Sequence, residues 1–184
     1  MPPEPLRIAI RSGPRNISTA MMRSFSSRSD CAVSDKPFYG CFPRASGADL
    51  PMCEAVIASM DCDWYSVAAG LARPVPGGRP IWYQKHMPHH MVGPLAPDDL
   101  RGVTHAFLIR DPARMVTSYA AKRETVTAGD LGVAAQRGFF EREASTGFGG
   151  AEPLVGDLPA GLAAVAGACR ADYGALAEYR LNAA

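Results

Sequence analysis

The sequence predicts an α/β domain built on a mostly parallel sheet of about four strands flanked by helices. Three observations support this fold class. Short β-branched and aromatic runs alternate with helical stretches along the chain. The clearest strand, THAFLIR (104–110), is followed at once by the clearest helix, DPARMVTSYAAKRE (111–124), in which Asp111 can cap and Pro112 takes the first helical position. The length of 184 residues suits one domain with a real core.

The strands and helices are expected in a regular order. Strands are predicted at 6–10, 31–35, 81–87 and 104–110. Helices are predicted at 18–25, 48–60, 63–72, 111–124, 130–145 and 158–181. Residues 1–184 form one domain, in which 1–141 are the nucleotide-binding core and 142–184 a linker and terminal helix, with the Gly/Pro-rich linker itself at 147–159.

Composition excludes several classes of protein. A hydrophobic content of 47% with 20% charged residues is typical of a globular domain, not of a disordered one. The net charge of +1 favours neither nucleic acid nor an anionic membrane as partner. Five cysteines without a C-x-x-C pair indicate reduced thiols in a cytoplasm. No signal peptide or membrane-length apolar run is visible, so the expectation is a soluble cytoplasmic protein.

The first strand ends in a turn that is suited to binding an anion. The stretch SGPRNIST, residues 12–19, leads from the strand directly into a helix. Backbone N–H groups and the helix dipole converge at such a point. Gly13 permits close approach, Arg15 offers a forked donor, and Ser18 and Thr19 add hydroxyls. The alternative is that Ser18 only caps its helix and Arg15 faces solvent. The spacing does not fit a Walker A loop, and no lysine precedes the hydroxyl residue.

A second anion site is predicted at the end of the last strand. Arg110 leaves that strand and Ser118 follows eight positions later on the next helix. Both side chains can converge at the carboxyl edge of the sheet, where ligands of open α/β sheets bind. Taken alone, the two residues fit a purely structural role equally well, with Arg110 in an ion pair and Ser118 on the face of its helix.

These two motifs together resemble the sulfotransferases that use 3′-phosphoadenylyl sulfate (PAPS). More closely, the stretches SGPRNISTAMM, KHMPHHM and LIRDPARMVTSY resemble a bacterial sulfotransferase-like subgroup, over about residues 6–140. The resemblance implies a three-layer P-loop-like fold and PAPS as donor co-substrate, with no metal. It implies that the 5′-phosphosulfate is bound by Arg15, Asn16, Ile17, Ser18 and Thr19. It implies that the 3′-phosphate is bound by Arg110 and Ser118.

The same resemblance suggests which groups act on the acceptor. Aligning QKHMP with the family's K-T-H-L-P stretch puts His86 at the position of the catalytic base. Lys85 is then shifted by one from the family lysine that contacts the sulfonate. His89 and His90 are either further candidates or simply solvated, and a zinc site at these histidines lacks a nearby acidic or cysteine ligand.

The chain departs from the resembled subgroup in two places. Its second strand ends Asp35-Lys36-Pro37, where the subgroup has Asp-Glu-Pro, so an ammonium replaces a carboxylate, and Asp35 remains as an acceptor-orienting group. An internal segment also appears absent after about residue 141, which implies a truncated sheet with an exposed edge that would allow self-association.

The predicted function is transfer of a sulfuryl group from PAPS to a hydroxyl or amine of an unidentified small molecule. One alternative is a non-catalytic nucleotide-binding remnant of a sulfotransferase, and a second is a small-molecule kinase. The expected partners are the small acceptor and, through the exposed edge, a second copy of the chain as a homo-oligomer. Neither nucleic acid nor a membrane is expected.

Overall fold

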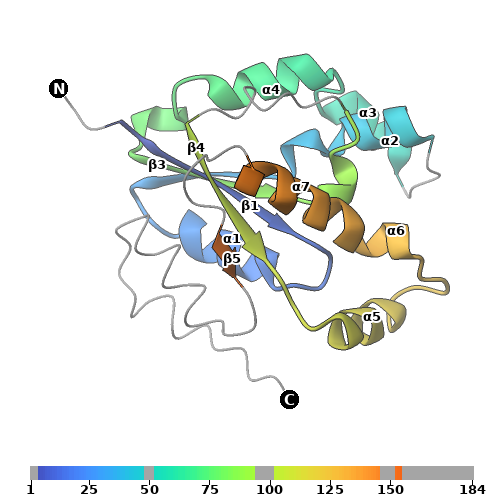
Figure 1. Ribbon diagram of the computed structural model, residues 1–184. Coiled ribbons are helices and arrows are strands. Elements are labelled where there is room, and N and C mark those ends of the chain that lie inside the picture. The colour runs from blue at the N-terminus through green and yellow to red at the C-terminus, as the bar shows by residue number, and fades with distance from the viewer. Residues whose placement is uncertain (1–3, 48–51, 94–101, 146–151, 155–184) are drawn as a thin grey trace.

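The structure is a computed structural model that describes residues 4–47, 52–93, 102–145 and 152–154. Within these ranges it is an α/β fold with a parallel sheet between two layers of helices (Figure 1). The predicted fold class is therefore confirmed. The predicted terminal helix at 158–181 lies outside the described residues.

The sheet has the strand order β2-β3-β1-β4-β5, and every neighbouring pair is parallel. The four predicted strands are present. They are β1 (Leu6–Ser12), β2 (Cys31–Asp35), β3 (Ile81–His86) and β4 (Val103–Leu108). A fifth, β5 (Glu152–Leu154), lies inside the stretch predicted as linker and pairs with β4. The prediction missed it because three residues are too few to show a period.

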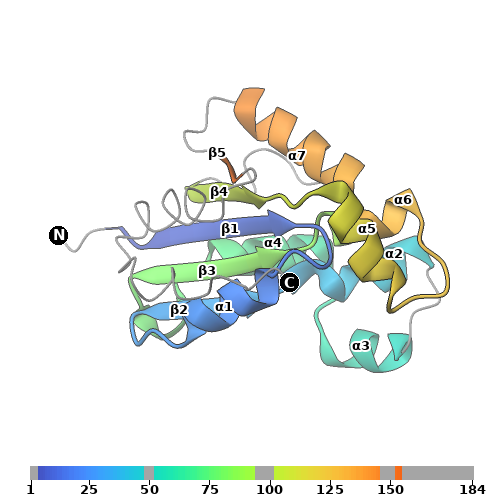
Figure 2. The ribbon, with the colours of Figure 1, turned by 90° about the horizontal axis from the view of Figure 1, so that it is seen from below.

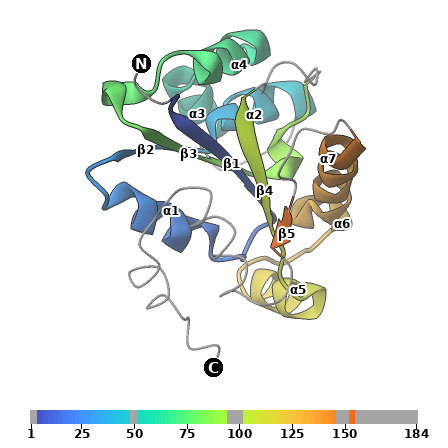
Figure 3. The same cartoon turned by 60° about the vertical axis from the view of Figure 1, so that its left-hand side comes forward.

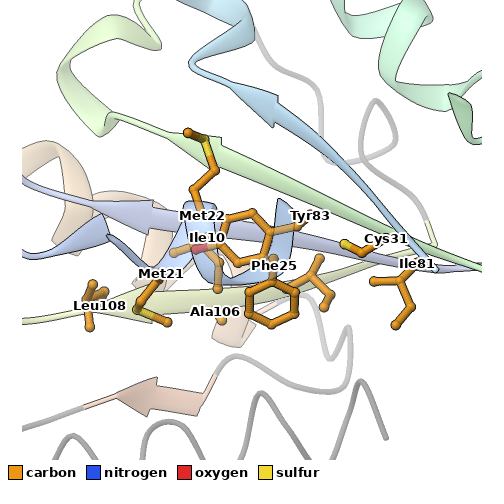
Figure 4. Close-up of a cluster of buried hydrophobic side chains, with 10 residues drawn as sticks. Ile10, Met21, Met22, Phe25, Cys31, Ile81, Tyr83, Ala106 and Leu108 are labelled. Atoms are coloured by element: carbon orange, nitrogen blue, oxygen red, sulfur yellow. The ribbon is translucent and has the colours of Figure 1, made fainter. Parts of the chain in front are cut away.

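β1 is the central strand, and its successive side chains point alternately to the two faces of the sheet. Ile8 and Ile10 lie in a cluster with Met21, Met22 and Phe25 of α1 (Ser18–Ser26), as Figure 4 shows. Tyr83 of β3 stacks on Phe25 with ring centroids 4.4 Å apart. α1 therefore covers one face of the sheet, because its apolar stripe repeats at the helical period.

The opposite face packs against α4 (Trp64–Ala72). Trp64, Val67 and Leu71 of this helix lie in a cluster with Trp82 of β3 and Phe38. Asp63 caps the helix by accepting a hydrogen bond from the Ser66 N–H at 2.7 Å. Figure 3 shows α1 and α4 on opposite sides of the strands.

The remaining helices lie mostly beyond the carboxyl ends of the strands (Figure 2). They are α2 (Cys41–Ser46), α3 (Cys53–Ser59), α5 (Pro112–Ala120), α6 (Ala128–Leu131) and α7 (Val133–Ser145), with 3-10 turns η1 (Pro37–Tyr39), η2 (Pro76–Gly78) and η3 (Pro88–His90). The cap of α5 is as predicted, since Asp111 accepts from the Arg114 N–H at 2.9 Å. The helix predicted at 130–145 is instead two helices, because Gly132 adopts φ 64° between them.

Candidate functional site

The loop between β1 and α1 has a backbone that exposes N–H groups. Arg15 and Ile17 have φ of 60° and 53°, in the left-handed region. Ile17 is the N-cap residue of α1, and its apolar side chain makes no capping hydrogen bond. The first N–H groups of α1 are therefore left for another acceptor. Ser18 and Thr19 are on the wall of the adjacent cavity, so both predicted hydroxyls lie at this helix start.

Side chains from distant parts of the chain hold the loop in place. Gln136 of α7 accepts a hydrogen bond from the Gly13 N–H at 3.2 Å and donates to the carbonyls of Arg11 and Leu108. Asn16 is buried and donates to the Leu108 carbonyl at 3.1 Å. Gly13 is required here, since a Cβ would lie 2.8 Å from the Leu131 carbonyl oxygen. Asn16 is therefore an anchor of the loop, and Gln136 is an anchor that the sequence analysis missed.

The two predicted anion motifs are in direct contact. Arg15 Nε donates to Ser118 Oγ at 2.9 Å, and Arg110 Nη1 donates to the Arg15 carbonyl oxygen at 2.7 Å. All three groups are partly or fully exposed, so they remain open to a ligand. The structure thus brings Arg15, Arg110 and Ser118 together at the carboxyl edge of the sheet.

A cavity of about 860 Å³ opens beside this cluster. That volume lies in the range of sites for small molecules and cofactors. Its wall also includes, beside the loop residues Arg15, Ser18 and Thr19, one residue near the end of β3 and residues that follow β2 and β3. Those residues are Lys36, Tyr39, Phe42, Lys85, Met87, Pro88, His89, His90 and Val92. Arg110 lines a separate apolar cavity of about 190 Å³, together with Asn16 and Gln136.

Asp35 lies between two lysines. Lys85 Nζ donates to Asp35 Oδ1 at 2.8 Å, and Lys36 Nζ lies 3.7 Å from Asp35 Oδ2. Lys85 is buried, and burial lowers the pKa of its ammonium while the hydrogen bond to Asp35 opposes that shift. Asp35 therefore holds the Lys85 ammonium in place on the cavity wall, a role that the sequence analysis did not predict.

His86 lies on the other face of the sheet from Lys85. Successive residues of a strand point to opposite faces, so Lys85 reaches the cavity and His86 does not. The side chain of His86 is 1% exposed and packs 5.9 Å from the Phe38 ring. Burial, together with the charges of Arg11, His105 and Lys85, holds the pKa of His86 well below its ordinary value. The structure does not bring the predicted base to the predicted donor site.

His89 and His90, in contrast, are on the cavity wall. Their rings are 4.3 Å apart, and among the described residues neither Nδ1 has a hydrogen-bond partner. Burial lowers the pKa of His90 to about 3. Burial also lowers the pKa of His89, but the Asp130 carboxylate opposes that shift. Both imidazoles are neutral near pH 7, and the imidazole of His89 is the more basic of the two.

The described residues contain neither a metal-binding cluster nor a membrane-spanning helix. Across the described ranges, no group of three or more His, Cys, Asp or Glu side chains is arranged to hold a metal ion. Over the same ranges, no helix has the length and apolar character needed to cross a membrane.

Comparison with known proteins gave one family. The model of a family described as "Sulfotransferase domain" matches residues 6–172. The curated protein "Branched-chain-amino-acid aminotransferase-like protein 2" of Arabidopsis thaliana is 31% identical over 108 residues, 59% of this chain and 19% of that protein. "Branched-chain-amino-acid aminotransferase-like protein 1" of the same plant is 32% identical over 116 residues, 63% of this chain and 21% of that protein. The chain thus spans about a fifth of the length of these relatives. No solved structure matches.

Proposed function

Because this chain belongs to the sulfotransferase domain family, we propose that it transfers a sulfuryl group from PAPS to a hydroxyl or amine of a small molecule. The observation that carries the proposal is the contact between the two anion motifs, Arg15 with Ser118 and Arg110 with the Arg15 carbonyl. Two phosphate-like groups of one nucleotide fit a site in which two cationic donors from different loops meet.

The residues fit such a donor in charge and in hydrogen-bonding capacity. The open N–H groups at the start of α1, with Ser18 and Thr19, suit the 5′-phosphosulfate. Arg110 and Ser118 suit the 3′-phosphate. Arg15 contacts Ser118, so its guanidinium lies where the two motifs meet and suits either anionic group of the donor. We call Gly13–Thr19 with Arg110 and Ser118 the donor side; Arg15, Ser18 and Thr19 line the large cavity, and Arg110 lines the separate smaller one.

The opposite wall suits the acceptor. We call Asp35–Phe42 with Lys85 and Met87–His90 the acceptor side. In the proposed reaction, an acceptor oxygen forms a bond to sulfur while the bond from sulfur to the bridging oxygen of the donor phosphate breaks, and the acceptor proton passes to a base. Preorganised cations contribute most to such a step by stabilising charge on the transferred group. Lys85, fixed by Asp35, is in position for that role.

We assign the base to His89 rather than to His86. A base must come within hydrogen-bond reach of the proton that it accepts. His89 is on the cavity wall and its imidazole is neutral near pH 7, whereas His86 is 1% exposed, packs against Phe38 and does not reach the cavity. His90 is a weaker candidate, because its pKa of about 3 makes it a poor proton acceptor.

Donor binding is the experiment that tests the proposal. Adenosine 3′,5′-bisphosphate should bind in the absence of metal, and should bind more tightly than AMP, in isothermal titration calorimetry. ATP with magnesium serves as the comparator for a kinase. Equal affinity for AMP, or a requirement for magnesium, would refute the donor assignment. Tight bisphosphate binding without transfer to any alcohol, phenol or amine would favour the non-catalytic alternative.

The setting of the protein is inferred from its thiols. The four cysteines in the described ranges, Cys31, Cys41, Cys53 and Cys62, are all free. Free buried thiols support the expected reducing, cytoplasmic location.

A further inference from the structure

We propose that the acceptor is an aromatic compound that carries an anionic group, bound by a cluster of rings and by Lys36. This inference rests on the proposed function, because it names the class of acceptor for that site. Three features of the acceptor side carry it: the rings, the placement of Lys36, and the balance of charge on the cavity wall.

The rings come from two short segments that follow β2 and β3. We use "ring cluster" for Tyr39, Phe42, His89 and His90, all of which are on the cavity wall. His90 lies 4.7 Å from Tyr39 and stacks on Phe42 at 5.0 Å, while Phe42 meets His89 edge-on at 6.0 Å. These distances are those of favourable aromatic pairs. Such a cluster offers ring faces and edges to a planar ligand.

Lys36 is held beside the ring cluster by an unusual backbone. Its φ of 52° lies in the left-handed region, which is unfavourable for a non-glycine residue. Its N–H donates to the Lys85 carbonyl at 2.8 Å, so the conformation is tied to the end of β3. The Lys36 ammonium then lies 5.3 Å from the centre of the Tyr39 ring. Backbone strain that places a charge at a cavity is a feature of ligand-binding positions.

The wall of the cavity has more positive than negative groups. Among the described residues, four cationic side chains line it, Arg15, Lys36, Lys85 and Arg123, against one carboxylate, that of Asp130. Asp35, behind the wall, is shared between Lys36 and Lys85, and the shorter contact is to Lys85. The Lys36 ammonium is therefore the less neutralised of the two, and 33% of its side chain is exposed.

The ring cluster adds no positive charge of its own at neutral pH. Burial keeps His90 uncharged, with a pKa of about 3, and lowers the pKa of His89. Selection by charge on this side therefore depends on Lys36. A ligand with a planar ring and an anionic substituent matches both elements, whereas a cationic ring compound would place its charge against an ammonium.

Three phenols that differ in one substituent test the inference. 4-Hydroxyphenylacetate is an anion, tyrosol is neutral and tyramine is a cation at pH 7. Their dissociation constants are measured by calorimetry, with and without adenosine 3′,5′-bisphosphate. We expect the anion to bind about tenfold more tightly than tyrosol, because one charge-assisted contact is worth about 1.5 kcal/mol or more, and tyramine to bind weakest.

Variants of Lys36 complete the test. Lys36→Asn keeps a residue that tolerates the left-handed region and should bring the anion to the affinity of tyrosol. Lys36→Glu should favour tyramine over the anion. Lys122→Asn, an exposed lysine outside the cavity wall, is the matched control and should keep the order of the unmodified chain.

The outcomes separate this inference from the proposed function. Equal binding of the three phenols to the unmodified chain, or no binding of any, overturns it even if the bisphosphate binds well. The same holds if Lys36→Asn keeps the preference for the anion. If the bisphosphate fails to bind while the preference and its dependence on Lys36 are observed, the donor assignment fails and the anionic aromatic site stands.

Discussion

The donor side is built around one turn of backbone, whereas the acceptor side is built from short segments that meet only in the folded chain. On the donor side, the turn after β1 exposes the N–H groups of α1, and Asn16 and Gln136 fix it from behind. On the acceptor side, the η1 and η3 turns bring rings together around Lys36 and Lys85. The turn of the donor side is thus specified by local sequence, whereas the placement of Arg110 and Ser118 beside it and the whole acceptor side depend on packing.

This contrast has a chemical counterpart. The donor side presents arginine, hydroxyl and backbone donors, which bind phosphate and sulfate oxygens whatever else the molecule carries. The acceptor side presents rings, two lysines and neutral histidines, which discriminate between ligands by shape and charge. We therefore expect variants of the donor side to change donor affinity, and variants of the acceptor side to change turnover and acceptor preference.

The largest effect is expected at His89. His89→Ala should lower kcat by about 10²–10⁴-fold, the usual contribution of a positioned base, and should leave bisphosphate affinity unchanged. The measurement is transfer from labelled PAPS to 4-hydroxyphenylacetate, per bisphosphate-binding site. Turnover should also rise with pH in a range below 6.5, since burial lowers the pKa of His89 and only the neutral imidazole accepts a proton.

His86→Ala is the matched control for that variant. It removes a buried side chain from the opposite face of the sheet, so the melting temperature should fall while kcat per folded site is kept. If His86→Ala abolishes turnover and His89→Ala retains it, the base is His86 as the sequence suggested.

The next effect is expected on the donor side, at Arg110. Arg110→Ala should weaken bisphosphate binding by about tenfold to a hundredfold, because it removes a charge-assisted contact worth about 1.5–3 kcal/mol. AMP, which lacks the 3′-phosphate, should lose much less affinity. Arg114→Ala, an exposed arginine on the helix α5 that follows Arg110, is the control. An unchanged preference for the bisphosphate over AMP would contradict the role of Arg110.

A smaller loss of bisphosphate affinity is expected at Gln136, which holds the loop after β1 in place through its hydrogen bonds. Gln136→Leu removes three hydrogen bonds and leaves the Gly13 N–H without a partner, at a cost of about 1–3 kcal/mol in the free energy of unfolding. Urea denaturation measures that loss. Bisphosphate affinity should fall with it, because the loop is no longer fixed. Full affinity in a destabilised variant would show that the loop keeps its shape without Gln136.

The last effect concerns pH and the acceptor side alone, and it changes stability rather than donor binding or turnover. The pKa of His90 is about 3 in the folded chain, so below its unfolded pKa near 6.5 the unfolded chain binds more protons. Stability should therefore fall as pH falls from about 6.5 toward 3, by at most about 1.4 kcal/mol per pH unit for this histidine. His90→Phe should flatten that slope in urea titrations at several pH values. An unchanged slope would mean that His90 is protonated in the folded chain.

The fold was largely predictable because its signals are local. The period of two in the strands, the helical spacing of Met21, Met22 and Phe25, and the Asp111–Pro112 start of α5 each need only a few adjacent residues. The helix 130–145 was predicted without its break, because the need for a positive φ at Gly132 depends on the packing of its neighbours. Had a Cβ stood there, it would lie 2.9 Å from His89 Nδ1.

The donor site follows from the sequence in the same way, while the acceptor site does not. A turn that joins a strand to a helix converges its N–H groups wherever it occurs, so Arg15, Ser18 and Arg110 could be identified from spacing. The alternation of β3 also fixes that Lys85 and His86 point to opposite faces. It does not say which face borders the cavity, because that depends on where η1 and η3 pack.

What the sequence determined by itself is therefore the strand and helix order and the two strand-to-helix turns that we propose bind anions, whose causes lie within a few residues. What only the tertiary structure decided is the pairing of groups far apart in the chain. The hydrogen bond from Gly13 to Gln136, the ion pair of Lys85 with Asp35 and the contact of Arg15 with Ser118 are of this kind. Each joins residues separated by 50 or more positions, and such contacts form only once the sheet and its helices have assembled.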